Sequence, residues 1–245
     1  MDLFRDKTIL VISPQSWGKM LVSKHHYAIE LAQRGNRVYF LNPPDQQRTD
    51  RKEKIGIAAS GVQENLLIIS HRLSFPYNLK FHFIGLFHLL MRRHVKKILQ
   101  RIGKPVDIVW SFDLGNLYPF SFFPDSSLKL FHPVDEPLNR EAINSAKGAQ
   151  FIFSVTPEIL EKYGEFPVPR HVINHGLIEE FLYREDMPGA AGGPLKVGFA
   201  GNLLRADIDR GTLLKIIRDN PEVHFVAWGG SWSGSGCGKK WRGSR

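Results

Sequence analysis

Short apolar runs of five to seven residues recur along most of the chain and are separated by longer amphipathic or polar stretches. Runs of this length are typical of strands that are buried on both faces of a parallel sheet. A Pro43-Pro44 pair follows one of them and ends it, because proline cannot continue a central strand. We expect strands at residues 8–13, 37–42, 65–70, 106–112, 128–132, 151–155 and 170–174.

Helical patterns fall between most of these runs. Ser23 can cap the first helix and Gly35 can end it, since a serine hydroxyl accepts from first-turn amides and glycine tolerates a positive φ. A long amphipathic helix is predicted to run through Gln100, with shorter helices near 140–146 and 158–163. The alternation predicts an α/β fold with a parallel sheet, helices on both faces and a ligand at the carboxyl ends of the strands.

The pattern changes at MPGAAGGPL (residues 187–195), whose small residues and prolines are typical of a linker. It then restarts with a strand, a helix and a second strand, which we expect at residues 196–202, 209–220 and 222–230. This is one βαβ unit, which is shorter than a domain normally needs to close its own core.

The chain is therefore expected to contain a first domain at 1–186, a linker at 187–195 and an incomplete second domain at 196–230. The tail at residues 231–245 is rich in serine and glycine, is basic, and lacks the periodicity of a helix or strand. We interpret this tail as non-native or disordered sequence.

The composition is that of a globular protein: 42% of the 245 residues are hydrophobic and 23% are charged. Cys237 is the only cysteine, which excludes a disulfide framework and favours the cytoplasm. No signal peptide is evident, because residues 1–7 are charged and the apolar run after them is short. The longest apolar stretch, residues 81–91, is well below the ~20 residues of a membrane span, so we expect no transmembrane helix.

The formal net charge is +9, and four of these charges lie in the tail. The remaining surplus suits an anionic ligand or an anionic membrane surface, and no nucleic-acid-binding signature accompanies it. Residues 81–97 pair a broad apolar face with several lysines and arginines. This segment is either an interfacial helix at the inner face of the membrane or a helix packed on the sheet, and we expect the packed helix.

The loop after the first strand carries candidate ligand-binding residues. A glycine at the first strand-to-helix turn lets backbone amides approach an anion, and the helix N-terminus adds about half a positive charge. Gly18, beside Trp17 and with Lys19 and Lys24 nearby, fits such a loop. The alternative is an ordinary Trp-Gly turn that holds no ligand.

His25 and His26 cannot both face one ligand, because neighbouring residues on a helix point about 100° apart. We expect one packed and one surface histidine, with His26 as the candidate for the cleft. One cysteine and scattered histidines do not make a zinc site, so no metal is expected.

Three segments carry a family resemblance: ISPQSWGKMLVSKHHYAIELAQRGNRVYFLNPP, FSVTPEILEKYGEFPVPRHVINHG and VGFAGNLLRADIDRG. In this order they resemble the nucleotide-sugar-dependent glycosyltransferases of the two-Rossmann (GT-B) type, specifically bacterial relatives of the retaining family called glycosyl transferases group 1 or family 4. The likeness covers residues 7 to about 230. It implies an acceptor-side Rossmann-like domain followed by the first βαβ unit of a donor-side Rossmann-like domain.

The resemblance implies roles for residues that follow the predicted strands. The loop of Trp17 and Gly18 would lie over the diphosphate or the acceptor. In FHPVDEP (residues 131–137) the family places a His-Asp or Asp-Asp pair near the acceptor and the reacting sugar, which points to His132, Asp135 and Glu136. Asp135 either orients the acceptor hydroxyl or accepts its proton, or it simply caps the following helix.

Further binding candidates come from the later motifs. Asn174-His175-Gly176 is the counterpart of a Pro-Asn-Gly turn in the family, with a histidine inserted. A basic residue after the first turn of the second domain stabilises the departing diphosphate in these enzymes, and the planar fork of arginine suits that role. Exposed arginines near helix starts are also ordinary surface residues. The candidates are Asn174, Gly176, Gly201, Asn202, Arg205 and Arg210.

The sequence thus predicts a transferase that moves a hexose from a nucleoside diphosphate sugar to a hydroxyl, with retention and without a metal or other cofactor. Its expected partners are that donor, a sugar or lipid-linked acceptor and, peripherally, the membrane. The family's donor-binding Glu-x7-Glu helix is absent from these 245 residues, so we expect most of one wall of the donor pocket to be missing.

Two alternatives remain open. One is a GT-B-like fragment that binds an acceptor, a membrane surface or a partner and catalyses nothing. The other, a dinucleotide-dependent oxidoreductase, is disfavoured because no Gly-x-Gly-x-x-Gly follows the first strand.

Overall fold

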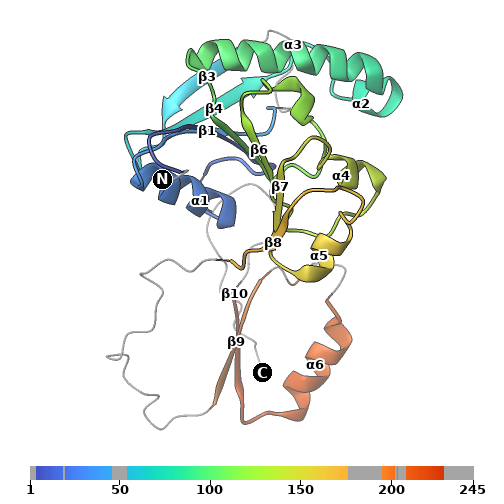
Figure 1. Ribbon diagram of the computed structural model, residues 1–245. Coiled ribbons are helices and arrows are strands. Elements are labelled where there is room, and N and C mark those ends of the chain that lie inside the picture. The colour runs from blue at the N-terminus through green and yellow to red at the C-terminus, as the bar shows by residue number, and fades with distance from the viewer. Residues whose placement is uncertain are drawn as a thin grey trace. The chain divides into compact units, whose positions relative to one another are not determined.

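The computed structural model describes residues 4–18, 20–45, 54–175, 195–201, 203 and 208–228. The chain divides into two compact units, Met1–Leu182 and Tyr183–Arg245 (Figure 1). The first unit contains the large sheet and most of the described helices, and the second contains one βαβ unit.

The described part of the first unit forms an eight-stranded sheet in the order β3-β4-β2-β1-β5-β6-β7-β8. All neighbouring strands are parallel except β3 and β4. From β1 the chain builds outward through β2 and β4, returns to β5 on the other side of β1, and continues to β8. The strands are β1 (Thr8–Ile12), β2 (Arg37–Leu41), β3 (Lys54–Ala59), β4 (Leu66–Arg72), β5 (Ile108–Ser111), β6 (Leu128–Phe131), β7 (Phe151–Ser154) and β8 (Arg170–Val172).

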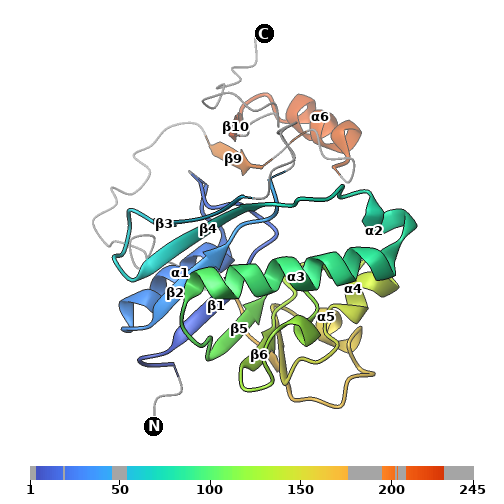
Figure 2. The same ribbon diagram turned by 90° about the horizontal axis from the view of Figure 1, so that it is seen from above.

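Helices cover both faces of this sheet, and Figure 2 shows α1 and α3 on opposite sides. The connection from β1 to β2 moves one way along the sheet and those from β4 to β5 and β6 to β7 move the other way. Right-handed crossovers therefore place α1 on one face and α3 and α4 on the other. The helical segments are α1 (Ser23–Gln33), α2 (Leu79–His82), α3 (Ile84–Ile102), the 3-10 turn η1 (Phe120–Phe122), α4 (Arg140–Asn144) and α5 (Pro157–Glu161).

The two faces have separate apolar cores. Alternate residues of a strand point to opposite faces, so Leu10 and Ile12 of β1 join the core under α3, whereas Ile9 and Val11 join the core under α1. Burial on both faces explains why these strands appear in the sequence as continuous apolar runs.

The strands expected from the sequence and the parallel sheet are confirmed, and the sheet has one further strand at an edge. Strand β3 was not anticipated, and it pairs antiparallel with β4, with Ile57 opposite Ile69. Its sequence, KIGIAA, alternates weakly, and most of its side chains are exposed. An edge strand with one covered face gives a weaker sequence signal than a central one.

The sequence predicted the C-terminal end of α1 correctly but not its N-terminal cap. Ser23 is not the cap, because the helix begins at Ser23 and its N-cap is Val22. The other end is as expected: Gly35 has φ of 88°, and the amides of Gly35 and Asn36 donate to the carbonyls of Ala32 and Leu31 at 2.9 and 3.3 Å. This is a Schellman ending, in which glycine supplies the left-handed residue.

Asn36 fastens this helix end to the start of the chain. Its side chain is fully buried, donates to the carbonyls of Phe4 and Leu31 at 2.6 and 2.8 Å, and accepts from the amide of Lys7 at 3.0 Å. Asn65, just before β4, donates to the carbonyls of Ala32 and Asn36. The α1–β2 turn is therefore held by side-chain amides.

The second unit holds β9 (Lys196–Ala200), α6 (Arg210–Asp219) and β10 (His224–Trp228). Strands β9 and β10 pair in parallel, with Gly198 opposite Val226, in a sheet separate from that of the first unit. The predicted first βαβ unit of a second Rossmann-like domain is thus confirmed. Among the described helices of both units, none combines the length and apolar character required to cross a bilayer.

Replacing Asn36 by Ala should lower the free energy of unfolding by about 2–3 kcal/mol, because it removes three hydrogen bonds that a fully buried side-chain amide makes with the backbone of Phe4, Lys7 and Leu31. The midpoint of urea unfolding measures this. The exposed Asn78, whose side chain does not cap α2, is the matched control, and Asn78→Ala should cost less than about 0.5 kcal/mol. Equal effects of both substitutions would contradict the assignment.

Candidate functional site

The candidate site lies where the strand order reverses, between β1 and β5. In an open α/β sheet, ligands bind outside the carboxyl ends of the strands at this point. Three segments leave the sheet there: residues 13–22 after β1, 112–119 after β5 and 132–139 after β6. The described residues of these segments include five of the predicted site residues, namely Trp17, Gly18, His132, Asp135 and Glu136.

The loop after β1 is anchored by Trp17. Its backbone amide donates to Oδ1 of Asn42 at 2.8 Å, and its ring packs edge-on against Phe40, with a centroid distance of 5.1 Å. Gly18 follows and is exposed, and a Cβ placed on it would meet no atom within 4 Å. Packing within this chain therefore gives no reason for glycine at this position.

His25 locks the start of α1. Its Nδ1 accepts from the amide of Val22 at 3.0 Å, and its Nε2 lies 3.2 Å from the carbonyl oxygen of Ser16, to which an Nε2–H donates. This pattern requires the neutral ring, and burial lowers the pKa of His25. The expectation of one packed histidine in the pair is confirmed for His25, while His26 is half-buried.

His132, the first residue after β6, is fully buried in an aromatic box. Its ring stacks on Phe112 at 4.9 Å and Trp110 at 6.0 Å, and Tyr27 of α1 lies 5.3 Å away. Neither ring nitrogen has a hydrogen-bond partner among the described residues. Burial, with smaller contributions from His175 and Lys24, lowers the pKa of His132 to about 4, so the ring is neutral at pH 7.

Lys24, in the first turn of α1, was not among the site residues predicted from the sequence. It is only 2% exposed, and burial lowers its pKa whereas the charge of Asp135 raises it. Lys24 also acts on His132 electrostatically. The structure therefore brings the buried Lys24, the buried imidazole of His132 and the Asp135 carboxylate together. The sequence feature that pointed to Lys24 was its position in the first turn of the helix that follows β1.

The segment after β6 carries two acids, Asp135 and Glu136, which have different surroundings. Asn139, not Asp135, caps α4, because its side chain accepts from the amide of Ala142 at 2.9 Å. The capping alternative for Asp135 is thus wrong, and this carboxylate is exposed. Glu136 is also exposed and forms an ion pair with Lys162 at 3.5 Å.

Asp113 after β5 has a structural task. It is buried, and its two carboxylate oxygens accept from the amides of Gly115 and Leu117 at 2.8 and 2.7 Å. Burial raises its pKa, while these bonds and nearby Lys80 oppose the rise. The Lys80 ammonium donates to the carbonyl of Gly115, so Asp113 and Lys80 shape the loop that follows β5.

A buried histidine pair lies behind the site. His71 Nδ1 is 2.9 Å from His94 Nε2, and His71 Nε2 is 2.9 Å from both the carbonyl oxygen of Asn42 and the hydroxyl of Tyr118. Burial and the charge of His94 lower the pKa of His71 to about 3. Asn42 thus binds the Trp17 loop through its side chain and the histidine pair through its backbone.

The remaining predicted residues belong to the segment after β8 or to the second unit, or are not described. Asn174 is exposed after β8. At Gly201 a Cβ would meet the Phe199 ring at 3.0 Å, so packing explains that glycine. Arg210 is exposed at the start of α6, whose cap is Asp209. The remaining candidates, Lys19, Gly176, Asn202 and Arg205, lie outside the described residues.

No group of three or more His, Cys, Asp or Glu side chains in the described ranges could hold a metal ion.

Comparisons with known proteins concern the fold. No family model and no curated protein matches the sequence. The structure is similar to sucrose-phosphate synthase from Thermosynechococcus elongatus, with a TM-score of 0.50 and 11% identity over 90% of this chain and 70% of that one. A shorter chain of the same synthase matches with a TM-score of 0.41 and 14% identity, over 69% of this chain and 90% of that one. Together with the large parallel sheet, the first match identifies a GT-B-like, Rossmann-type fold, as the sequence predicted.

Replacing His132 by Phe should make the protein less sensitive to acid. The pKa of His132 is about 4 in the folded protein against an ordinary 6.5, so between these values the unfolded chain binds the additional proton. The stabilising contribution of the neutral ring is complete above pH 6.5 and is lost as the pH falls toward 4.

Relative to wild type, His132→Phe should therefore gain about 1 kcal/mol of unfolding free energy per pH unit as the pH falls from 6.5 to about 4.5. Urea unfolding at several pH values measures this difference. His82→Asn, on an exposed histidine of α2, is the control. Parallel curves for wild type and His132→Phe would contradict the burial argument.

Proposed function

We propose that this protein transfers a hexose from a nucleoside diphosphate sugar to a hydroxyl acceptor, and that the site between β1 and β6 holds the reacting groups. The proposal is carried by one observation: a buried histidine, whose ring nitrogens have no partner among the described residues, lies near a buried lysine at the switch point of a GT-B-like sheet. A buried polar ring without a partner costs free energy that a bound hydroxyl would recover.

Lys24 is the proposed anion-binding group. Its ammonium is held at the start of an eleven-residue helix, where the helix dipole adds positive potential. Burial makes the attraction between an ammonium and a phosphate oxygen stronger than it is in water. The exposed Gly18 backbone lies in the loop that precedes this turn, and we assign it to close approach of the diphosphate or the acceptor.

His132 and Asp135 are the proposed contacts to the sugars. The neutral imidazole donates from one nitrogen and accepts at the other, which matches the two roles of a sugar hydroxyl. A ring with a pKa of about 4 is a poor proton acceptor at neutral pH, so we assign His132 to positioning the sugar. The exposed Asp135 carboxylate is the group proposed to orient the acceptor hydroxyl or to receive its proton.

The transfer forms a bond between the acceptor oxygen and the anomeric carbon and breaks the bond to the diphosphate oxygen. The products are the glycoside, the nucleoside diphosphate and a proton. Negative charge develops on the leaving diphosphate, and preorganised cations lower the energy of that state. We propose Lys24 for this task, with retention and without a bound metal as the family resemblance implies.

Ligand-dependent unfolding tests the proposal. The melting temperature is measured with UDP, GDP and ADP, with a sugar nucleotide of each, and with NADH. A ligand at 100 times its Kd stabilises the folded protein by about 2.7 kcal/mol, which shifts the melting temperature measurably. Stabilisation by a sugar nucleotide supports the proposal, stabilisation by NADH alone favours an oxidoreductase, and no shift with any of them favours a binding protein without catalysis.

Replacing Lys24 by Met should weaken binding of the nucleoside diphosphate about tenfold, because a charge-assisted contact of about 1.5 kcal/mol is lost. Met retains the length and the burial of the side chain. The Kd is measured by calorimetry, and the exposed Lys147 supplies the control Lys147→Met, which should bind as wild type does. An unchanged affinity in Lys24→Met would remove Lys24 from the site.

Gly18→Ala separates a ligand role from a folding role. A methyl group at position 18 meets no atom within 4 Å, so unfolding should change by less than about 0.5 kcal/mol, while sugar-nucleotide affinity should fall several-fold. The control is Gly35→Ala, whose φ of 88° strains an alanine and should cost about 1 kcal/mol of stability without affecting the affinity. Wild-type affinity in Gly18→Ala would show that the loop is only a turn.

A further inference from the structure

The segment from α2 to the middle of α3 exposes an unusual number of large apolar side chains. Phe81 and Phe83 are 72% and 64% exposed, and three more residues in the next six positions are also exposed. We call this group the apolar ridge, and it consists of Phe81, Phe83, Ile84, Leu86 and Leu89. Contiguous exposed apolar groups of this kind mark interaction sites more often than scattered ones do.

The ridge is not part of the core of the unit. α3 packs on the sheet through a different stripe, which includes Phe87, Met91 and Val95. The sequence-based expectation of a packed helix is therefore confirmed, yet packing occupies only one side of α3. Residues Leu86, Leu89, Arg93 and Lys96 follow each other at spacings of three and four and so share the opposite side.

The exposed side of α3 changes from apolar to cationic along its length. Leu86 and Leu89 are followed one turn later by Arg93 and Lys96, both exposed. Arg92 is also exposed, and it donates to the carbonyl of Ser121 at 2.9 Å and lies over the Phe122 ring. The exposed apolar side chains and the positively charged side chains thus lie on one continuous surface.

The charge in this part of the chain has one sign. Between Glu64 and Asp107 the sequence contains eight lysines and arginines and no aspartate or glutamate. Neither helix and no residue of β4 contributes a carboxylate, and the acids from other segments that lie near them, Asp45 and the buried Asp113, are close to Arg72 and Lys80. A surface of this kind is attracted to polyanions over the range that salt screening allows, about 10 Å.

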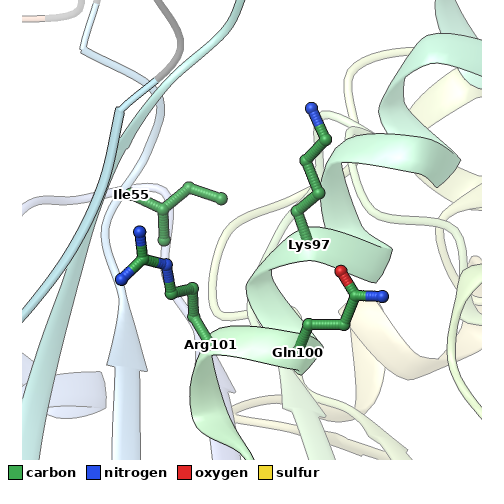
Figure 3. A pocket seen from close by; sticks show the side chains of 4 residues that line it. All are labelled: Ile55, Lys97, Gln100 and Arg101. Carbon is green, nitrogen blue, oxygen red and sulfur yellow. The ribbon is translucent and has the colours of Figure 1, made fainter.

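A pocket of about 370 Å³ lies at the cationic end, between β3 and the last two turns of α3. Figure 3 shows Lys97, Gln100 and Arg101 projecting from α3, with Ile55 across from them on β3. Two cations beside an amide and an aliphatic side chain suit a phosphate group attached to an apolar body.

We propose that the α2–α3 surface docks on a bilayer that contains anionic phospholipids. The apolar ridge enters the headgroup and acyl boundary, while the basic residues of α3 lie against lipid phosphates. This division matches an interfacial helix, which needs apolar area and positive charge together. Nucleic acid would pair with the basic residues but would leave Phe81 and Phe83 in water. The inference does not rest on the proposed transferase activity.

Co-sedimentation of the full chain with vesicles tests the proposal without donor or acceptor. One set of vesicles contains phosphatidylcholine alone, and the other contains equal parts of phosphatidylcholine and phosphatidylglycerol. The protein should bind the anionic vesicles at least about tenfold more tightly than the neutral ones, and added salt should weaken this binding.

Two pairs of variants separate the apolar and cationic contributions. Phe81→Ser with Phe83→Ser should weaken binding to anionic vesicles by about tenfold or more, whereas Leu138→Ser, at a 93% exposed residue beyond the docking surface, should leave it unchanged. Arg93→Glu should weaken binding on the order of tenfold, whereas Lys147→Glu should have a much smaller effect. Circular dichroism and thermal unfolding confirm that each variant is folded.

The outcomes discriminate clearly. Selective loss in the α2–α3 variants supports docking by this surface. Equal loss in the control variants shows only general attraction of a basic protein and overturns the proposal. Binding to a mixed-sequence DNA duplex with no binding to anionic vesicles also overturns it, in favour of nucleic acid. Because no sugar nucleotide is present, failure here leaves the transferase proposal intact, and the reverse also holds.

Discussion

The two hydrogen bonds of His25 set the geometry on which the candidate site depends. By accepting from the amide of Val22 and donating to the carbonyl of Ser16, the neutral ring ties the loop after β1 to the first turn of α1. That turn carries Lys24 into the protein, and the next turn places Tyr27 against His132. A protonated His25 could not accept from Val22, so burial, which lowers its pKa, maintains the arrangement.

The site holds its polar groups at an energetic cost. Lys24 and His132 are both buried, both have lowered pKa values, and within the described part of the chain the histidine has no partner on either nitrogen. Asp113, by contrast, is buried with both carboxylate oxygens satisfied by backbone amides. Asp113 therefore shapes a loop, whereas the ring nitrogens of His132 find no partner among the described residues, and this difference is the reason to propose a ligand beside His132.

Much of the fold could be predicted from the sequence because the central strands are buried on both faces and appear as continuous apolar runs. Strand β3 was missed because KIGIAA at a sheet edge has little periodicity. Position after a strand marked His132 and Asp135 as candidates, whereas Lys24 was noted only as a lysine near the Gly18 loop and its burial was not predicted. Ser23 was taken for a cap, but no side chain caps the first-turn amides of α1, and His25 instead accepts from the backbone amide of Val22. Gly18 and Gly201 both follow a strand in the sequence. Only the structure shows that a Cβ at Gly201 would approach the Phe199 ring, whereas a Cβ at Gly18 would meet no atom within 4 Å.

Asn42 makes hydrogen bonds that connect the two faces of the sheet. Its side chain holds the Trp17 amide over one core, while its carbonyl meets the ring of His71, which is joined in turn to His94 of α3 in the other core. His94 of α3 is therefore connected to the first loop through three consecutive hydrogen bonds. If a ligand in the loop and an event on the outer side of that helix both displace these bonds, linkage requires each to alter the free energy of the other by the same amount.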